Sequence, residues 1–269
     1  MRALRELWEF RVLVLNLASR ELRAKYKKSV LGWLWSLINP LAILLVYTLV
    51  FGVFLRIEPP VAGNGELESF GLYLFAALVL WNLFHAIVNG SMASLAGAGP
   101  LLRKVYFPPE CTVIANVLAA LLQAVAEAVI LAAVLVVVSN VSWTFLLFPV
   151  LMALLVLFAT GIGLIVSIGN IYYRDVSYLV GIALNILFYA TPIIYPLSFV
   201  PGVAWGLPAK TIIELNPLTQ FTELARNLMY GLESGPTARW GYVLLSSIVS
   251  LALGWYVFQR RAALVSEEV

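Results

Sequence analysis

The side chains most able to bind a charged ligand form one basic cluster near the start of the chain. The cluster holds Arg20, Arg23, Lys25, Lys27 and Lys28 within nine residues. Such a cluster attracts phosphate, and its ligand could be the anionic headgroups of lipids in general or one lipid-linked pyrophosphate in particular. The residues alone favour the general interpretation.

Catalytic chemistry is harder to place on this chain. It has no Walker A pattern, no HExxH, no GxSxG and no paired intramembrane aspartates. The single Cys111 excludes an intramolecular disulfide, and together with the single His85 it leaves too few ligands for a structural zinc site. We therefore expect a chain that is not an enzyme and binds no cofactor or metal of its own. Without a nucleotide site, active transport would need a partner subunit to supply the energy.

One ionisable residue, Glu127, lies inside a long apolar run, near Gln123 and Asn116. A carboxyl group at that depth is costly, which makes it a functional candidate by default. The alternative is a protonated or hydrogen-bonded packing residue at a helix contact, and the sequence does not decide between the two. His85, near the end of another apolar run, is better explained as a hydrogen-bonded histidine at a helix interface.

The elements that must position these side chains are membrane-spanning helices. The chain has 269 residues, of which 62% are hydrophobic and only 12% charged, whereas roughly a quarter of the residues of a soluble domain are charged. The pattern predicts an all-α integral membrane protein with six transmembrane helices. The expected spans lie at about 30–55, 70–88, 113–138, 143–167, 178–195 and 242–258. Pro40 is expected to kink the first span, and Pro192 and Pro196 to end the fifth.

Residues 1–29 precede this transmembrane domain of residues 30–269 and predict an amphipathic helix in the membrane interface. Arg11, Leu13 and Leu17 do not fit its pattern, so part of it could pack against another protein. Its expected apolar side consists of Leu4, Leu7, Trp8, Val14, Leu15, Ala18, Leu22 and Tyr26.

The distribution of charge predicts the orientation of the six spans. Thirteen of the seventeen lysines and arginines fall on the side that holds both chain ends, and the other side holds only Arg56, Lys210, Arg226 and Arg239. Cytoplasmic segments of membrane proteins carry the excess of positive charge. We therefore expect both termini in the cytoplasm.

The connection between the second and third spans predicts a short helix at about 100–107. Gly99 and Pro100 can begin it, and Pro108 and Pro109 end it after about two turns. Apolar residues on one side and two positive charges suit docking into a groove of another protein, whereas the alternative is a plain loop that binds headgroups. The segment consists of Pro100, Leu101, Leu102, Arg103, Lys104, Val105, Tyr106 and Phe107.

Residues 200–231 are too polar to span, and they predict a pair of half-inserted helices. The better one begins at Asn216 as its N-cap, with Pro217 at its first position, and ends near Gly231. One face of this helix should be apolar, at Leu218, Phe221, Leu224, Ala225 and Leu228.

Aromatic residues make up 13% of the chain. In a pore their faces would stack on sugar rings without fixing them tightly, which suits a sliding polymer. For any single residue, an interfacial belt or lipid contact is the better explanation. The candidates for a channel lining are Trp33, Trp35, Tyr47, Phe51, Trp81, Phe188 and Tyr189.

Four segments carry a resemblance to a known family. They are RELRAKYKKSVLGWLWSLINPLAILLVYTLVFG, LLRKVYFPPE, NIYYRDVSYLV and NPLTQFTELARNLMYG, in that order. The chain resembles, over nearly its whole length, the membrane subunit of ABC exporters for lipid-linked polysaccharides, the O-antigen permease family with its capsule and teichoic-acid relatives. The resemblance implies a homodimer in the bacterial cytoplasmic (inner) membrane, bound to two copies of an ATPase subunit that uses ATP and magnesium. It also implies a substrate built on undecaprenyl pyrophosphate that passes between the two permease subunits.

The resemblance also implies roles for particular residues. Residues 100–107 match a coupling helix against the ATPase, and Arg174 with Asp175 matches a short cytoplasmic loop. Asn216 and Pro217 match the start of a re-entrant gate helix on the outer side, which contains Phe221. The lipid pyrophosphate would approach Arg20, Arg23, Lys25 and Lys27. The polymer stays open, and the alternatives are export of teichoic acid, capsule, a drug or a small lipid, or a membrane enzyme acting on polyprenyl-linked glycans.

Overall fold

The computed structural model describes residues 8–26, 29, 31–57, 60–204 and 206–268. Lys27 and the side chains of Lys25 and Trp33 lie outside the described residues, so the roles predicted for them stay predictions. Within the described ranges the chain is helical, and the β pairing found there is one antiparallel bridge between Ala204 and Leu207. The all-α prediction is therefore confirmed for this part of the chain.

Four helices of the described chain are long and apolar enough to cross a membrane, and two shorter apolar stretches cover Ile38–Phe54 and Val176–Ala190. The chain is thus a membrane protein with at least four candidate spans. The long helices are α4 (Phe70–Gly97), α6 (Glu110–Val137), α7 (Phe148–Tyr172, preceded by the 3-10 segment Trp143–Leu147) and α11 (Thr237–Glu268).

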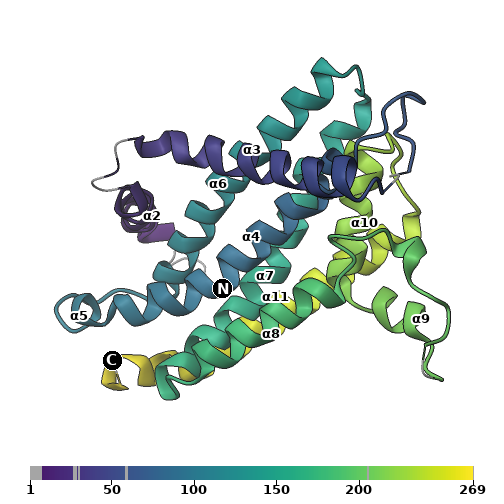
Figure 1. Ribbon diagram of the computed structural model, residues 1–269. Helices are drawn as coiled ribbons and strands as arrows, with labels where there is room; N and C mark the ends of the chain where they lie inside the picture. Colours follow the sequence, from purple (N-terminus) through teal and green to yellow (C-terminus); the bar gives the residue numbers. More distant parts are fainter. Residues whose placement is uncertain (1–7, 27–28, 30, 58–59, 205, 269) are drawn as a thin grey trace.

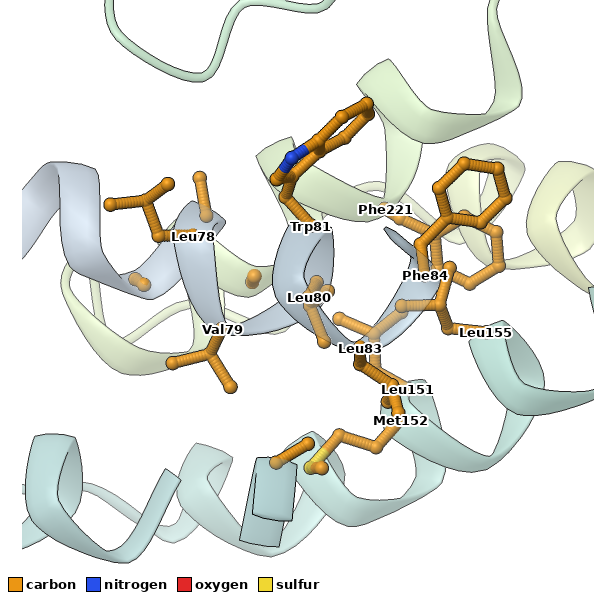
Figure 2. Packing of buried hydrophobic residues seen from close by; sticks show 14 of the residues in the cluster. Leu78, Val79, Leu80, Trp81, Leu83, Phe84, Leu151, Met152, Leu155 and Phe221 are labelled. Carbon is orange, nitrogen blue, oxygen red and sulfur yellow. The ribbon is translucent and has the colours of Figure 1, made fainter. Parts of the chain in front are cut away.

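Helix α4 forms the centre of the bundle. It packs against α6, α7 and α10 (Pro217–Met229), and nearly all of its first half is buried. Figure 2 shows this core, in which Leu80, Leu83 and Phe84 of α4 meet Leu151 and Leu155 of α7. Burial of several such side chains, at roughly 1.5–3 kcal/mol each relative to water, would stabilise a soluble core. In a bilayer, close packing contributes more of the stability.

Glycine permits the closest helix contact of the structure, between α7 and α11. A Cβ atom on Gly161 would collide with the backbone of Ser250, and one on Gly254 would collide with the backbone of Gly161. Small residues let two backbones approach closely inside a membrane, where the hydrophobic effect does not drive helices together. This contact fixes α11 along α7.

The first predicted span is helical but not uniformly α-helical. A 3-10 turn (Gly32–Leu34) leads into α3 (Trp35–Tyr47), which continues through Pro40, and a π-helical segment follows at Thr48–Phe54. The change of helix type falls at Thr48, whose hydroxyl donates a hydrogen bond to the Leu44 carbonyl at 2.8 Å. A side chain that engages the preceding turn in this way often bends a helix.

Among the helices that form the predicted spans, α4 and α8 end at other residues than predicted. The second span does not stop near 88 but continues to Gly97, because Ser91, Met92 and Leu95 remain buried against neighbouring helices. The fifth, α8 (Val176–Ala190), ends before the predicted 195, since Thr191 takes the extended conformation that a following proline favours.

Two short elements also differ from prediction. The predicted helix at 100–107 is only the single turn α5 (Gly99–Leu102), and the chain continues through a turn at Arg103 and Lys104 and a bend at Val105. Helix α2 (Arg11–Tyr26) buries Val14, Leu17 and Ala18 against α6, whereas Trp8 and Leu15 of the predicted apolar side are exposed. This helix therefore packs on its own chain. Its buried face shares Val14 and Ala18 with the predicted apolar side but is rotated toward Leu17 and away from Leu15.

The bundle has two distinct ends in Figure 1. Helix α2, α5, the turn between α7 and α8, and the last part of α11 gather at one end. The short helices α9 (Ala209–Glu214) and α10 lie at the other end. Two helices were predicted within 200–231, and the second has the predicted start and the predicted buried residues.

Candidate functional site

The segment predicted to dock a partner, residues 99–107, presents two different surfaces. Leu101 and Leu102 are half-buried against the cluster formed by α2 and α6, and Phe107 is buried. Val105 and Tyr106 point outward, and Tyr106 is 85% exposed. Arg103 and Lys104 are exposed beside them. The outward surface of residues 103–106 is thus apolar and cationic, while the leucines hold it to the bundle.

Part of the predicted phosphate-binding cluster lies on an open surface of α2. Arg20 and Arg23 are exposed and line a depression of about 550 Å³ together with Asn16 and Ser19. Glu21, on the other side of the helix, faces a smaller cavity of about 220 Å³ that Asn116 and Gln123 also line. Burial raises the pKa of the Glu21 carboxyl, and the positive charge of Arg20 opposes this rise. The depression leaves the two guanidinium groups available to an anion.

The predicted channel aromatics differ in how far their side chains are exposed. Trp35 and Tyr189 are exposed, whereas Trp81 is only 7% exposed. The centre of its ring lies 5.3 Å from the centre of the Phe188 ring. Trp81 therefore belongs to the core in this structure, which corrects its assignment to an open lining. Tyr47 and Phe51 lie between these extremes, half-buried, and Phe51 stacks on Phe70 of α4 at 5.1 Å.

The predicted gate residues anchor helix α10. The side chain of Asn216 accepts a hydrogen bond from the Leu218 backbone N–H at 3.0 Å, which is the predicted N-cap, and donates one to the Thr191 hydroxyl at 2.9 Å. Phe221 is fully buried and contacts the ring of Phe158 at 5.8 Å. These contacts tie the start of α10 to the segment after α8.

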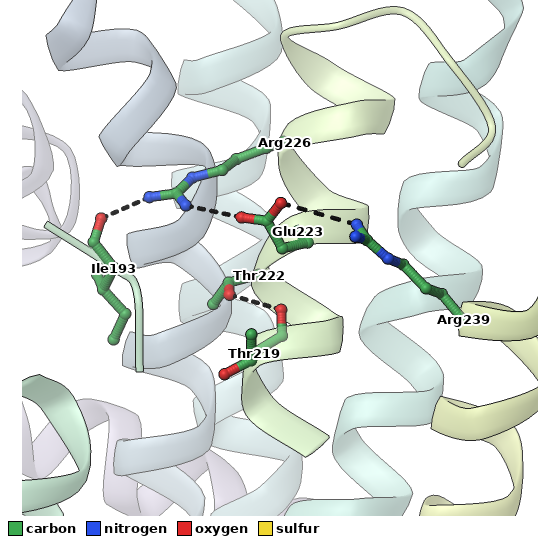
Figure 3. Close-up of polar contacts among 6 residues, drawn as sticks. All are labelled: Ile193, Thr219, Thr222, Glu223, Arg226 and Arg239. Carbon is green, nitrogen blue, oxygen red and sulfur yellow. Dashed lines mark hydrogen bonds and ion pairs between the residues drawn. The ribbon is translucent and has the colours of Figure 1, made fainter. Parts of the chain in front are cut away.

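A buried arginine on α10 was missed by the sequence analysis, which counted Arg226 only as a charge of the outer side. Arg226 is 3% exposed, and Figure 3 shows its guanidinium between Glu223 and the backbone of Ile193. It donates to the Ile193 carbonyl at 2.7 Å, pairs with Glu223 at 3.1 Å and lies 4.1 Å from the ring centre of Tyr73. The Glu223 carboxylate also pairs with Arg239 of α11 at 3.7 Å. Its position next to Ala225 placed it off the predicted apolar face, because consecutive helix residues point in different directions, so the local sequence carried no signal of its burial.

Glu127 lies at the contact between α6 and α4, 3% exposed. It accepts hydrogen bonds from the side-chain amides of Asn82 at 3.0 Å and Gln123 at 3.5 Å. This geometry is that of a hydrogen-bonded packing residue, one of the two interpretations left open. His85 hydrogen-bonds to Asn89 at 3.0 Å, as expected, but its side chain is exposed.

Asn140 is a second residue that sequence reasoning missed. Fully buried in the turn after α6, it donates to the carbonyls of Met229 and Tyr230 at 3.1 Å and accepts from the Asn64 backbone at 3.2 Å. It thus joins two loops to the end of α10. Across the residues that the structure describes, no group of His, Cys, Asp and Glu side chains is arranged to hold a metal ion.

The described chain is a helical membrane bundle with an outward cationic and apolar segment at one end. Residues 12–230 match the family of ABC-2 type transporters, so the chain belongs to the membrane proteins of that family. It is 29% identical to the O-antigen export system permease protein RfbA of Myxococcus xanthus, over 86% of this chain and 85% of the relative. A protein of the same description from Klebsiella pneumoniae is 28% identical over 77% of this chain and 75% of the relative. The polysialic acid transport protein KpsM of Escherichia coli is 25% identical over 93% and 94%.

Proposed function

We propose that this chain is the permease subunit of an ATP-driven exporter that moves undecaprenyl-pyrophosphate-linked polysaccharide, of the O-antigen kind, across the bacterial inner membrane. The observation that carries the proposal is the family match over residues 12–230 together with the similarity to O-antigen permeases over most of both chains. The chain itself performs no chemistry in this proposal. It provides a path, and its partner hydrolyses ATP.

The outward surface of residues 103–106 supports docking of an ATPase subunit. Permeases of this family normally work with an ATPase, and a projecting aromatic ring beside two cations fits a groove of opposite charge. Because α5 lies directly after α4, a displacement of the docked segment would act on the helix at the centre of the bundle. This continuity suits transmission of force from a partner.

The exposed faces of α3 and α8 support a homodimer with a path between its subunits. Helix α8 buries only Leu184, while Tyr178, Ile182, Ile186 and Tyr189 are exposed along it. On α3, Trp35, Leu41 and Leu45 are exposed in the same way. A second copy would cover part of these faces, and Trp35 and Tyr189 are then the aromatics best placed to meet sugar rings.

The arrangement of charge supports cytoplasmic termini. Arg20, Arg103, Lys104, Arg174 and Arg260 belong to the elements gathered at one end of the bundle in Figure 1. The positive-inside rule assigns that end to the cytoplasm. The lipid pyrophosphate would then meet Arg20 and Arg23 in the depression on α2, and α10 would close the path at the outer end.

The proposal is tested by reconstitution with a candidate ATPase subunit from the same organism. In proteoliposomes, the pair should move an undecaprenyl-pyrophosphate-linked glycan only with ATP and magnesium. Val105→Asp and Tyr106→Asp should abolish both ATPase binding and transport, because they place a carboxylate in the docking surface. Val203→Asp, an exposed valine in the segment that precedes α9, is the matched control and should leave both intact. ATPase binding that survives Val105→Asp and Tyr106→Asp would refute the docking role.

A second candidate substrate is a capsular polysaccharide, because the KpsM relative named for polysialic acid transport is similar over nearly its whole length. The two candidates are separated by complementation. Restored surface O-antigen in a permease-deficient strain supports the first, and restored capsule without O-antigen supports the second.

A further inference from the structure

A lipid-sized groove lies on the surface of the bundle, and none of its lining residues belongs to the docking segment, the α2 depression or α10. It has a volume of about 910 Å³ and is bounded by α6, α7 and α11. Along α11, the groove is lined by Ile248, Ala252, Tyr256 and Arg260. These positions are four residues apart and therefore lie on one face of the helix. The groove thus follows the helix axis.

The chemistry of the groove changes along its length. Its α7 wall includes Leu157 and Thr160, and the Thr160 hydroxyl is already used in a 2.6 Å hydrogen bond to its own helix. At the other end lies Arg260, whose guanidinium rests 4.4 Å from the ring centre of Tyr256. Among the side chains that the structure describes, which end at Arg261, no carboxylate forms an ion pair with Arg260. An apolar channel therefore ends at an available positive charge.

The length of the groove matches one leaflet of a bilayer. Ile248 and Arg260 are separated by about 18 Å along a helix that rises 1.5 Å per residue, and half of the hydrocarbon core is about 15 Å thick. Arg260 comes just after the apolar stretch of α11 that ends at Phe258, where a basic side chain is expected at the depth of the headgroups. A ligand whose charge contacts Arg260 would therefore extend its apolar part to about the bilayer midplane.

We propose that this groove binds one anionic phospholipid of the leaflet that adjoins the C-terminal end of α11. Its phosphate contacts Arg260, and one acyl chain lies in the groove along the surfaces of α7 and α11. Basic residues at the ends of grooves between transmembrane helices are suited to anionic headgroups. The site is separate from the transport path proposed above and does not depend on it.

Charge favours a lipid over a second copy of the chain as the occupant. In a two-fold dimer each surface meets its own equivalent, so contact through this end of the groove would bring two copies of Arg260 together. Arg261 next to it would add to the repulsion. An anionic lipid neutralises the same charges.

The site can be tested with brominated phospholipids, which quench tryptophan fluorescence on contact. Trp255 lines the groove and serves as the reporter, and the difference between the wild-type chain and Trp255→Phe isolates its signal from the other tryptophans. The full chain, with any subunit that copurifies, is titrated in nanodiscs with brominated phosphatidylglycerol or phosphatidylcholine. We expect phosphatidylglycerol to bind about fivefold more tightly, the effect of one basic residue near an anionic surface.

Two variants sharpen the test. Arg260→Gln should remove the preference for phosphatidylglycerol, and Arg260→Lys should keep it. Arg174→Gln, an exposed arginine outside the groove, is the matched control and should change nothing. Equal quenching by both lipids in the wild-type chain would overturn the proposal, as would an unchanged preference in Arg260→Gln. Absence of Trp255 quenching by either lipid would also overturn it, because protein would then cover the groove. If Arg260→Gln does not fold, the site is still tested by whether the wild-type and Arg260→Lys chains prefer phosphatidylglycerol to phosphatidylcholine.

Discussion

Replacement of Arg226 by methionine removes the cation that joins α10 to two other parts of the chain, the turn after α8 and helix α4. The substitution breaks the 3.1 Å pair with Glu223 and leaves the Ile193 carbonyl without its 2.7 Å donor. It also removes the charge 4.1 Å from the ring of Tyr73. Methionine fills much of the same volume, so the effect measured is that of the charge and its hydrogen bonds.

The expected loss in the free energy of unfolding depends on which contacts the partners of Arg226 keep after the substitution. Loss of one member of a buried ion pair costs about 3–5 kcal/mol, because the remaining charge is buried alone. Here Glu223 is 14% exposed and keeps Arg239 at 3.7 Å. We therefore expect the lower end of that range, about 3 kcal/mol, which corresponds to a fall in the melting temperature of about 6–12 °C.

The measurement is thermal unfolding of the purified chain in nanodiscs, followed by intrinsic fluorescence. Arg226→Lys keeps the charge but loses the planar fork, and should cost about 1–2 kcal/mol, the value of one hydrogen bond to a charged group. Arg239→Gln removes the partner that is 26% exposed and should cost less than about 1 kcal/mol. If Arg226→Met were no less stable than Arg239→Gln, the guanidinium would not hold α10, and the reasoning would be wrong.

Three further predictions concern other polar and charged side chains. Asn140→Ala should lower the free energy of unfolding by about 2–3 kcal/mol, because the buried carbonyls of two residues lose their donor, and thermal unfolding measures this. Glu127→Gln should retain most of the wild-type transport in proteoliposomes, since an amide oxygen can still accept from Asn82; a loss of more than tenfold would favour a proton-carrying role instead. Arg20→Gln combined with Arg23→Gln should lower substrate-stimulated ATP hydrolysis by at least about fivefold while assembly is unchanged, and unaltered stimulation would reduce these arginines to an orientation signal.

The long elements of this fold were predictable because a bilayer fixes both their length and their composition. The spans that became α6, α7 and α11 needed only a continuous apolar run. The start of α10 was predictable for a different reason, because Asn216 and Pro217 form a local cap that needs no tertiary partner. Both kinds of signal are contained in a short stretch of sequence.

The residues that sequence reasoning misplaced depend on contacts between distant segments. Nothing near Arg226 in the sequence indicates that the carbonyl of Ile193 lies beside it, and nothing near Asn140 indicates the end of α10. Trp81 was expected on a lining because aromatic faces can stack on sugar rings, but its neighbours on α8 and α4 enclose it. The rotation of α2 was missed for the same reason, since the buried face was decided by α6 and not by the pattern of α2.

The two anchors of α10 have a joint consequence for how this end of the bundle can move. Asn216 at the start of the helix holds Thr191, and Arg226 near its end holds Ile193. Both partners lie in the turn directly after α8, which itself buries only one residue. The turn after α8 is therefore bonded to both ends of α10, to Asn216 and to Arg226. It cannot rotate about one of these contacts without breaking the other. A shift of α8 at an interface would therefore carry α10 with it as one unit, and the inward side of α10 would respond through Phe221 and its contact with Phe158.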